Sequence, residues 1–286
     1  MRLPLWVSDC FFDFYREEKF MRRVKRGFFL ILCLAVLTCT LTGCYRKAGD
    51  FKVEKKGDSY TIMDLSKEGY QKKELVIYNK IGDYDIRDIS FPEPGLIFVP
   101  LISKFPPMIR SEALEAVYFV DYVPTNNSYF FARCYNLKKI VRIRDAEYDL
   151  QCEAYTIYPS DEGASNYSGS HEVNQYVRYS TYLKCCNDED LFFIQPANIS
   201  YFYNYENANN EGYYWLDNFD YGTKITYIPP EPTREGYTFG GWYKEEDCIN
   251  KWDFETDTLP EAILDEEGEP VYQETKLYAR WISESF

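Results

Sequence analysis

Beyond residue 59, the hydrophobic positions fall in short stretches separated by polar, Gly- or Pro-containing segments. These stretches are rich in β-branched and aromatic side chains, which pack well on the pleated surface of a strand. We therefore expect strands at residues 60–63, 75–78, 191–194, 199–205, 224–228 and 275–281. In the last of these, Leu277, Ala279 and Trp281 share one face, because side chains alternate along a strand. The pattern predicts a mainly β protein.

An internal repeat lies between residues 114 and 140. Leu114 and Val117 are followed 23 residues later by Leu137 and Ile140, in the same spacing. A period of about 20–29 residues is typical of leucine-rich repeats. In these repeats, neighbouring turns stack and bury their apolar residues together.

Residues 123–140 resemble the BspA-type leucine-rich repeats of bacteria. The shared features are a Pro after the strand, an aromatic-Ala step, then Cys, Asn and Leu, at Pro124, Phe131-Ala132, Cys134, Asn136 and Leu137. The resemblance implies a short leucine-rich-repeat-like β-solenoid at residues 60–196, with residues 75–89 as its first segment. In that setting Cys134 is a small buried hydrophobe. Arg142 stands where the second strand should be apolar, so we expect a bulge or register shift there. The number of repeats stays open.

The C-terminal part combines a proline-rich segment with a dense aromatic pattern. Its order is Pro229 to Pro232, then Gly236-Tyr237-Thr238-Phe239-Gly240-Gly241-Trp242-Tyr243, Trp252-Asp253-Phe254 and Thr275 to Trp281. Residues 197–282 thereby resemble the Listeria–Bacteroides repeat, the B-repeat module of internalin-like surface proteins. The resemblance implies a small β-grasp-like domain at residues 197–286. Gly240-Gly241 permits a bulge beside Trp242, and we expect the acidic insertion at residues 261–270 to be an exposed loop.

An apolar run at residues 28–41 follows the basic residues Arg22, Arg23, Lys25 and Arg26. A positive segment, a short apolar core and small residues are typical of a secretory signal. The run is shorter than the roughly 20 residues that span a bilayer. Leu41, Thr42, Gly43 and Cys44 resemble the lipobox of bacterial lipoproteins. The resemblance implies that the Cys44 sulfur carries a diacylglyceryl group and that cleavage makes Cys44 the N-terminus. The alternatives are an uncleaved signal anchor or a generic secretory peptide with a chance cysteine.

These segments give the predicted organisation of the chain. Residues 1–43 hold a signal-peptide helix, and residues 44–59 are charged and read as a lipidated tether. Asp13, Glu17 and Glu18 do not fit the positive start of a signal peptide. We therefore expect Met21 to be the true start and residues 1–20 to be a mis-assigned extension. A cytosolic segment with its own function is the alternative.

Net charge and cysteine content limit the classes of partner and of metal site that we expect. With 46 Asp and Glu against 32 Lys and Arg, the net charge is −14. Such a surface repels phosphate backbones, so we expect no nucleic-acid partner. Five cysteines follow Cys44, an odd number without C-x₂-C spacing: Cys134, Cys152, Cys185, Cys186 and Cys248. A zinc site is disfavoured because the chain has one histidine, His171, and the disulfide pairing stays open.

No sequence motif for catalysis or for a cofactor is present: the chain lacks a phosphate-binding Gly-rich loop, a G-x-S-x-G elbow, an H-E-x-x-H pair and an EF-hand. Acidic clusters at residues 188–190 and at Asp253 with Glu255 are candidate glycosidase pairs, although solvated acidic faces explain them as well. Asp217 and Asp220, beside aromatic residues, are candidates for Ca²⁺ or sugar binding. We expect no enzyme activity, no cofactor and no resident metal.

We therefore expect a non-enzymatic lipoprotein on the outer face of a bacterial membrane, held by the lipid on Cys44. It would serve in adhesion or binding of a protein or glycan, because Tyr-rich polar loops such as residues 201–214 are typical of recognition surfaces. One alternative is a carbohydrate-active or cell-wall enzyme that uses surface carboxylates. The other is a stalk or spacer without a ligand.

Overall fold

The computed structural model describes residues 45–89, 109–121, 130–144, 155–157, 171–186 and 189–284. Within these ranges the chain is mainly β, as predicted. The signal segment, the lipobox with Cys44, and Cys152 lie outside the described residues. In the described part of the chain, no helix is both long and apolar enough to cross a bilayer. Residues 47–286 form one compact unit.

The first sheet is built from the segment before residue 90. Its strands are β1 (Arg46–Ala48), β2 (Phe51–Lys56), β3 (Ser59–Leu65), β5 (Lys80–Ile81) and β6 (Tyr84–Ile89), in the order β1-β2-β3-β6-β5. A short 3₁₀ turn, η1 (Gly69–Gln71), follows β3. Phe51 and Val53 are buried while Lys52 and Glu54, which alternate with them, are more exposed, as in a half-buried strand. The prediction of a tether for residues 44–59 is therefore wrong over β1 and β2, because charge in this segment masked its alternating apolar positions.

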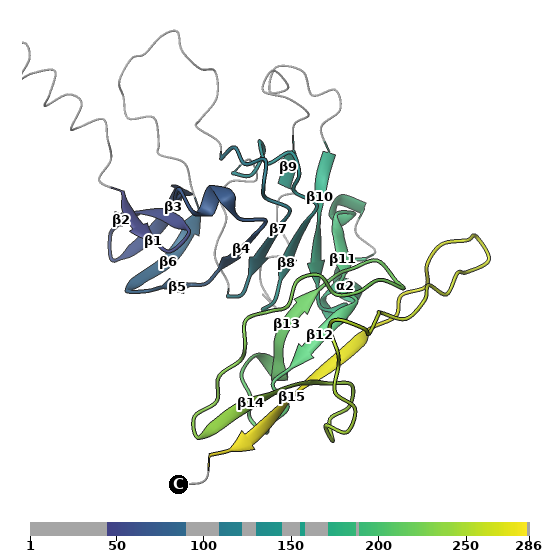
Figure 1. Ribbon diagram of the computed structural model, residues 1–286. Coiled ribbons are helices and arrows are strands. Elements are labelled where there is room, and N and C mark those ends of the chain that lie inside the picture. Colours follow the sequence, from purple (N-terminus) through teal and green to yellow (C-terminus); the bar gives the residue numbers. More distant parts are fainter. Residues whose placement is uncertain are drawn as a thin grey trace, which may run out of the picture. The chain divides into compact units, whose positions relative to one another are not determined.

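The second sheet is parallel along its main path and follows the chain order (Figure 1). Its strands are β4 (Glu74–Ile77), β7 (Ala116–Phe119), β8 (Lys139–Arg142), β10 (His171–Val177) and β11 (Ile194–Pro196), and β9 (Tyr155–Ile157) pairs antiparallel with β10. Val117 pairs with Ile140, so the 23-residue spacing is the register of β7 and β8. The assignment to leucine-rich repeats and the solenoid stay predictions.

Arg142 does not disturb this register. It pairs with Phe119 without a bulge, so the predicted register shift is wrong. The side chain is accommodated by polar and aromatic neighbours: its Nε donates to Gln175 Oε1 at 2.8 Å, and its guanidinium lies 5.6 Å from the centre of the Phe119 ring. A hydrogen-bonded Gln175, itself buried, lets one charged residue occupy a position that the pattern reserves for an apolar one.

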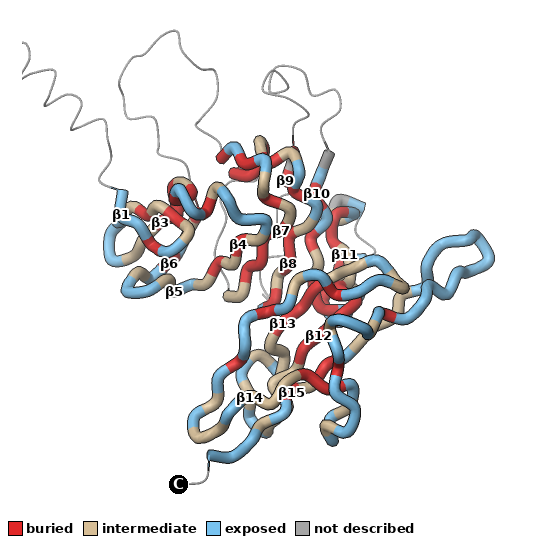
Figure 2. Tube along the Cα trace, in the orientation of Figure 1, coloured by how far each residue is buried: buried red, intermediate tan, exposed pale blue. Residues whose placement is uncertain are grey.

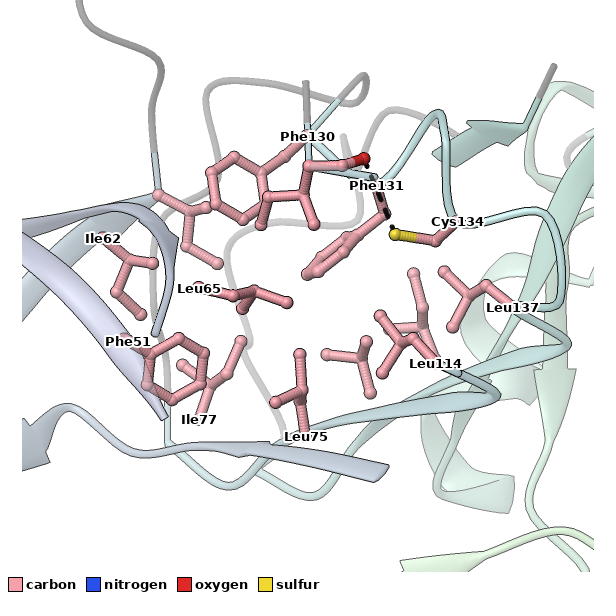
Figure 3. Packing of buried hydrophobic residues seen from close by; sticks show 14 of the residues in the cluster. Phe51, Ile62, Leu65, Leu75, Ile77, Leu114, Phe130, Phe131, Cys134 and Leu137 are labelled. Atoms are coloured by element: carbon pink, nitrogen blue, oxygen red, sulfur yellow. Dashed lines mark hydrogen bonds between the residues drawn. The ribbon is translucent and has the colours of Figure 1, made fainter. Parts of the chain in front are cut away.

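One face of the parallel sheet packs with the first sheet in a shared core. Figure 3 shows Phe51, Ile62 and Leu65 facing Leu75, Ile77 and Leu114 across this core. Cys134 is buried there, its Sγ donates to the Ile109 carbonyl at 3.8 Å, and burial raises the pKa of its thiol to about 12. The prediction that Cys134 packs as a hydrophobe is confirmed.

Past β10 the chain forms helix α2 (Tyr179–Cys185) and the 3₁₀ turn η3 (Glu189–Leu191), then enters the C-terminal module. Its four strands are β12 (Ile199–Phe202), β13 (Tyr213–Asp217), β14 (Tyr237–Tyr243) and β15 (Thr275–Ser283), in the order β13-β12-β15-β14, with the turn η4 (Asn210–Gly212) before β13. The central strands β12 and β15 are parallel and the outer pairs are antiparallel. The β-grasp description stays a prediction.

Three local features were predicted for this module, and two of them are present. The register of β14 shifts between Phe239 and Trp242, and Gly241 has a φ of +107°, so the Gly240-Gly241 bulge is confirmed. Residues 261–270 are all exposed, as expected for the acidic insertion. The strand predicted at residues 224–228 is wrong: Ile225 is buried, but the segment pairs with no strand of the described residues, and it leads into Pro229 and Pro230, which have no backbone N–H to continue a ladder. Buried residues concentrate on the strands of the sheets (Figure 2).

A surface ion-pair cluster joins the starts of three parallel strands. The Glu115 carboxylate, just before β7, accepts hydrogen bonds at 2.8 Å from Lys73, before β4, and from Lys138, before β8. These two partners lower the pKa of Glu115 from its ordinary value of 4.5 to about 2.

We predict that Glu115→Gln reduces the acid sensitivity of folding. The folded carboxylate binds its proton more weakly than the unfolded one, so its contribution is present above about pH 4.5 and is lost as pH falls toward 2. Because the pair is screened by solvent, the loss at pH 7 should be about 1 kcal/mol or less. Thermal unfolding of the full chain at pH 7, 4 and 3 measures this, with Glu112→Gln as the control. An equal melting-temperature difference at all three values would contradict the prediction.

Candidate functional site: a groove above a buried ion pair

Asp217, at the end of β13, is fully buried and is held by two side chains of the parallel sheet. The Tyr118 hydroxyl donates to Asp217 Oδ2 at 2.8 Å. Lys139 Nζ donates to Asp217 Oδ1 and, at 2.9 Å, to the Asn218 carbonyl. The three residues come from β7, β8 and β13, so one carboxylate ties the C-terminal module to two strands of the other sheet.

The electrostatics of this cluster follow from burial. Burial raises the pKa of Asp217 above its ordinary value, against the opposing effects of the Lys139 ammonium and the Tyr118 hydroxyl. Burial and the Asp217 charge raise the pKa of Tyr118. Lys139 has a side chain that is 16% exposed and lies 4.0 Å from the centre of the Phe219 ring, a cation–π geometry. The cation is therefore enclosed between a carboxylate and an aromatic face.

Strand alternation explains why these side chains face the C-terminal module. Successive residues point to opposite faces of a strand, and Val117 and Ile140 face the core shared with the first sheet. Their neighbours therefore form two rows across the other face. One row is Val76, Tyr118, Val141 and Tyr176, and the next is Glu74, Ala116, Lys139 and Asn174.

The first row is covered by aromatic residues of the C-terminal module. The Tyr118 ring stacks on Tyr227, with ring centres 4.8 Å apart at 20°, and lies 5.0 Å from Trp215. Ala116, Tyr118, Val141 and Ile143 belong to the same buried cluster as Trp215, Trp242 and Leu277. The module thus completes its core on the parallel sheet.

A second buried cation binds the module at another point. Arg178, between β10 and α2, is 2% exposed and donates to the Asn210 carbonyl at 3.1 Å and to Glu211 Oε2 at 3.2 Å. Its guanidinium lies 4.2 Å from the centre of the Tyr213 ring. Asn210 Nδ2 also donates to the Ile143 carbonyl at 3.4 Å. Two polar clusters at different strands therefore fix the orientation of the module on the sheet.

Three adjoining clefts open beside this junction. The first, of about 420 Å³, includes Glu74, Lys139, Tyr176, Asn218 and Tyr227 in its lining. The second, of about 450 Å³, includes Asn174, Tyr176, Asn218, Tyr221 and Tyr272. The third, of about 390 Å³, includes Tyr135, Asn136, Lys138, Glu172 and Asn174. Because Tyr176 and Asn218 line the first two and Asn174 lines the last two, we treat the three clefts as one groove, the junction groove.

Two of the rings along the junction groove, Tyr272 and Tyr221, are held by main-chain hydrogen bonds. The Tyr272 hydroxyl donates to the Ala197 carbonyl at 2.9 Å, and its ring stacks on Tyr179 with centres 4.4 Å apart. The Tyr221 hydroxyl donates to the Gln273 carbonyl at 3.2 Å and accepts from the Gln273 amide at 2.8 Å. Rings held in this way lose little conformational freedom when a ligand packs against them.

The structure places the predicted site residues in different environments. Asp217 is buried in the ion pair, whereas Asp220 is exposed at the edge of the junction groove, so the two do not form a joint binding site. Asp253 accepts a hydrogen bond from the Glu255 amide at 2.8 Å, which lowers the pKa of Asp253. That direction is opposite to the raised pKa of a general acid. Glu189 is exposed, Asp188 lies outside the described residues, and so does Cys44 with its lipobox.

The cysteines and acids of the described ranges form no disulfide and no metal cluster. Cys134, Cys186 and Cys248 are free thiols, and no group of three His, Cys, Asp or Glu side chains is placed to hold a metal ion there.

The residues that build the junction were not predicted from the sequence: Tyr118, Lys139, Asn174, Tyr176 and Asn218. The alternation of side chains along a strand could have indicated Tyr118, because a strand that faces Val117 toward the core must turn Tyr118 to the other face. The pairing with Asp217, a distant residue along the chain, has no sequence signal because it depends on how two sheets pack.

Comparison with known proteins identifies part of the module. Residues 201–264 match the Listeria-Bacteroides repeat domain. A 62-residue stretch is 39% identical to a protein of Evansella cellulosilytica whose name describes it as a membrane protein, covering 22% of this chain and 7% of that one. A stretch of 32 residues is 56% identical to internalin H of Listeria monocytogenes, covering 11% of this chain and 6% of internalin H.

The chain therefore carries a Listeria-Bacteroides repeat, as the aromatic pattern predicted. The matched range ends before β15, although β15 pairs with both β12 and β14 and completes the sheet. The matching stretches span at most 7% of the length of these two relatives.

We predict that Lys139→Met lowers the free energy of unfolding by about 3 kcal/mol at pH 7, because it leaves the buried Asp217 charge without its partner. The loss should be smaller at pH 4, where a carboxyl of raised pKa takes up a proton in the folded state. Urea unfolding of the detergent-solubilised full chain measures both values.

Two variants serve as controls for this prediction. Lys138→Met, next in sequence but exposed and paired with Glu115, should cost about 1 kcal/mol or less. Adding Asp217→Asn to Lys139→Met should recover stability at pH 7, since no buried charge remains. Equal losses for Lys138→Met and Lys139→Met would show that the buried pair has no special weight.

Proposed function

We propose that this protein is a lipid-anchored, non-enzymatic protein of the bacterial cell surface that binds an extracellular protein or glycan in the junction groove. The repeat at residues 201–264 supports a surface-associated protein, as do partial relatives that are named as a membrane protein and as internalin H. Anchoring rests on the lipobox resemblance at Leu41 to Cys44. Two acyl chains on one cysteine would provide the two lipid signals that stable anchoring takes.

The junction groove is the single observation that carries the binding function. Each of its clefts has a volume in the range of about 300–1,000 Å³ that is typical of ligand sites. Tyr118 and Lys139 in its lining are fixed by Asp217, and Tyr221 and Tyr272 are held by main-chain hydrogen bonds. A site that is already ordered spends little binding free energy on ordering itself. A pure spacer would not need such a surface.

We predict that Cys44→Ala releases the protein from the membrane fraction and removes the mass of the lipid. The physical reason is that each buried CH₂ of an acyl chain contributes about 0.8 kcal/mol to membrane binding. Cell fractionation and mass spectrometry of the expressed full chain measure the effect, with Cys39→Ala, inside the apolar run, as the matched control. Unchanged membrane association and mass in Cys44→Ala would refute lipid anchoring.

We predict that Thr226→Trp reduces ligand binding at least tenfold, because Thr226 is exposed and lines the first cleft, which an indole would fill. The full chain in detergent micelles is passed over immobilised extracellular-matrix proteins and glycans, and affinity is measured for each variant. Thr258→Trp, exposed and outside all three clefts, is the control. A ligand that binds Thr226→Trp as tightly as the wild type does not use this groove.

A further inference from the structure

We propose that the ligand of the junction groove is an uncharged glycan chain, recognised at the point where the three clefts meet. This inference rests on the proposed binding function and names the ligand class. Asn174, Tyr176 and Asn218 form a group of uncharged polar side chains at this point. Tyr176 and Asn218 line the first and second clefts, and Asn174 lines the second and third.

This group presents neutral polar atoms to the groove. The amide side chains of Asn174 and Asn218 lie beside the Tyr176 hydroxyl, whose pKa is raised above its ordinary value by burial. Two primary amides and one phenolic hydroxyl together offer both donors and acceptors to a ligand. Neutral donors and acceptors, side by side, match the hydroxyl groups of a sugar ring.

Aromatic rings on either side suit the apolar faces of sugar rings. Tyr227 lies in the first cleft, Tyr221 and Tyr272 in the second, and Tyr135 in the third. The C–H face of a sugar packs on the electron-rich face of an aromatic ring, as other weakly positive groups do. Polar groups flanked by aromatic rings along the three adjoining clefts therefore fit a chain of several sugar units.

Charge selects against an acidic glycan. The cations that line the groove are already committed: Lys138 pairs with Glu115, Lys139 with Asp217, and Lys224 donates to the Glu255 carbonyl. Glu74, Glu172 and Asp220 add negative charge to the lining, and the whole chain has a net charge of −14. An anionic chain would be repelled, whereas an uncharged one pays no such cost.

The test measures binding of three uncharged hexasaccharides to the full chain in detergent micelles, by isothermal titration: β-linked glucose, β-linked N-acetylglucosamine and α-linked mannose. A heparin hexasaccharide is the anionic comparison. Asn174→Ala, at an exposed position, removes one polar partner, and Tyr176→Phe removes the hydroxyl but keeps the ring. Asn209→Ala, exposed and outside the groove, is the matched control.

We expect at least one uncharged hexasaccharide to bind, with about tenfold weaker binding in Asn174→Ala and in Tyr176→Phe and no change in Asn209→Ala. Tighter binding of heparin, or equal binding in all variants, would overturn the inference. If no sugar binds but an immobilised protein does, and Thr226→Trp blocks it, the glycan inference fails while the proposed binding function stands. If neither sugars nor proteins bind, both fail.

Discussion

The buried contact between Asp217, Lys139 and Tyr118 is the constraint on which the arrangement of the sheets depends. A carboxylate with no exposed surface is tolerated only when cations and donors satisfy it. Here the partners lie on β7 and β8, so the end of β13 is fixed on two neighbouring strands of the parallel sheet. Few orientations of the module on the parallel sheet would let Asp217 keep both hydrogen bonds. The contact therefore contributes more to the orientation of the module than to net stability.

Because of this contact, the C-terminal repeat is not an independent domain with a core of its own. It shares its core with Tyr118, Val141 and Ile143 of the parallel sheet. Figure 2 shows buried residues on β7 and β8 as well as on β12. The parallel sheet is therefore covered on both faces, by the first sheet on one and by the module on the other, as parallel sheets generally require.

The junction groove exists because the two sheets meet at this orientation. Asn174 and Tyr176 belong to β10, while Asn218 and Tyr221 follow β13, so neither sheet holds the site alone. The ion pair also holds Lys139 against Asp217, beside the uncharged side chains of Tyr176 and Asn218 that line the groove. The Asp217 cluster therefore both fixes the module on the sheet and holds Lys139 beside the groove.

The sequence by itself determined the local features: strands at residues 75–78 and 275–281, the 23-residue register of β7 and β8, burial of Cys134, the Gly240-Gly241 bulge and the C-terminal repeat. These depend on alternation, backbone freedom and side-chain size, which act between near neighbours. Only the tertiary structure decided that β1 and β2 join a sheet, that Arg142 stays in register beside Gln175, and that Asp217 meets Lys139. Such outcomes depend on which distant polar and apolar surfaces must cover each other, and alternation along one strand carries no information about its partner.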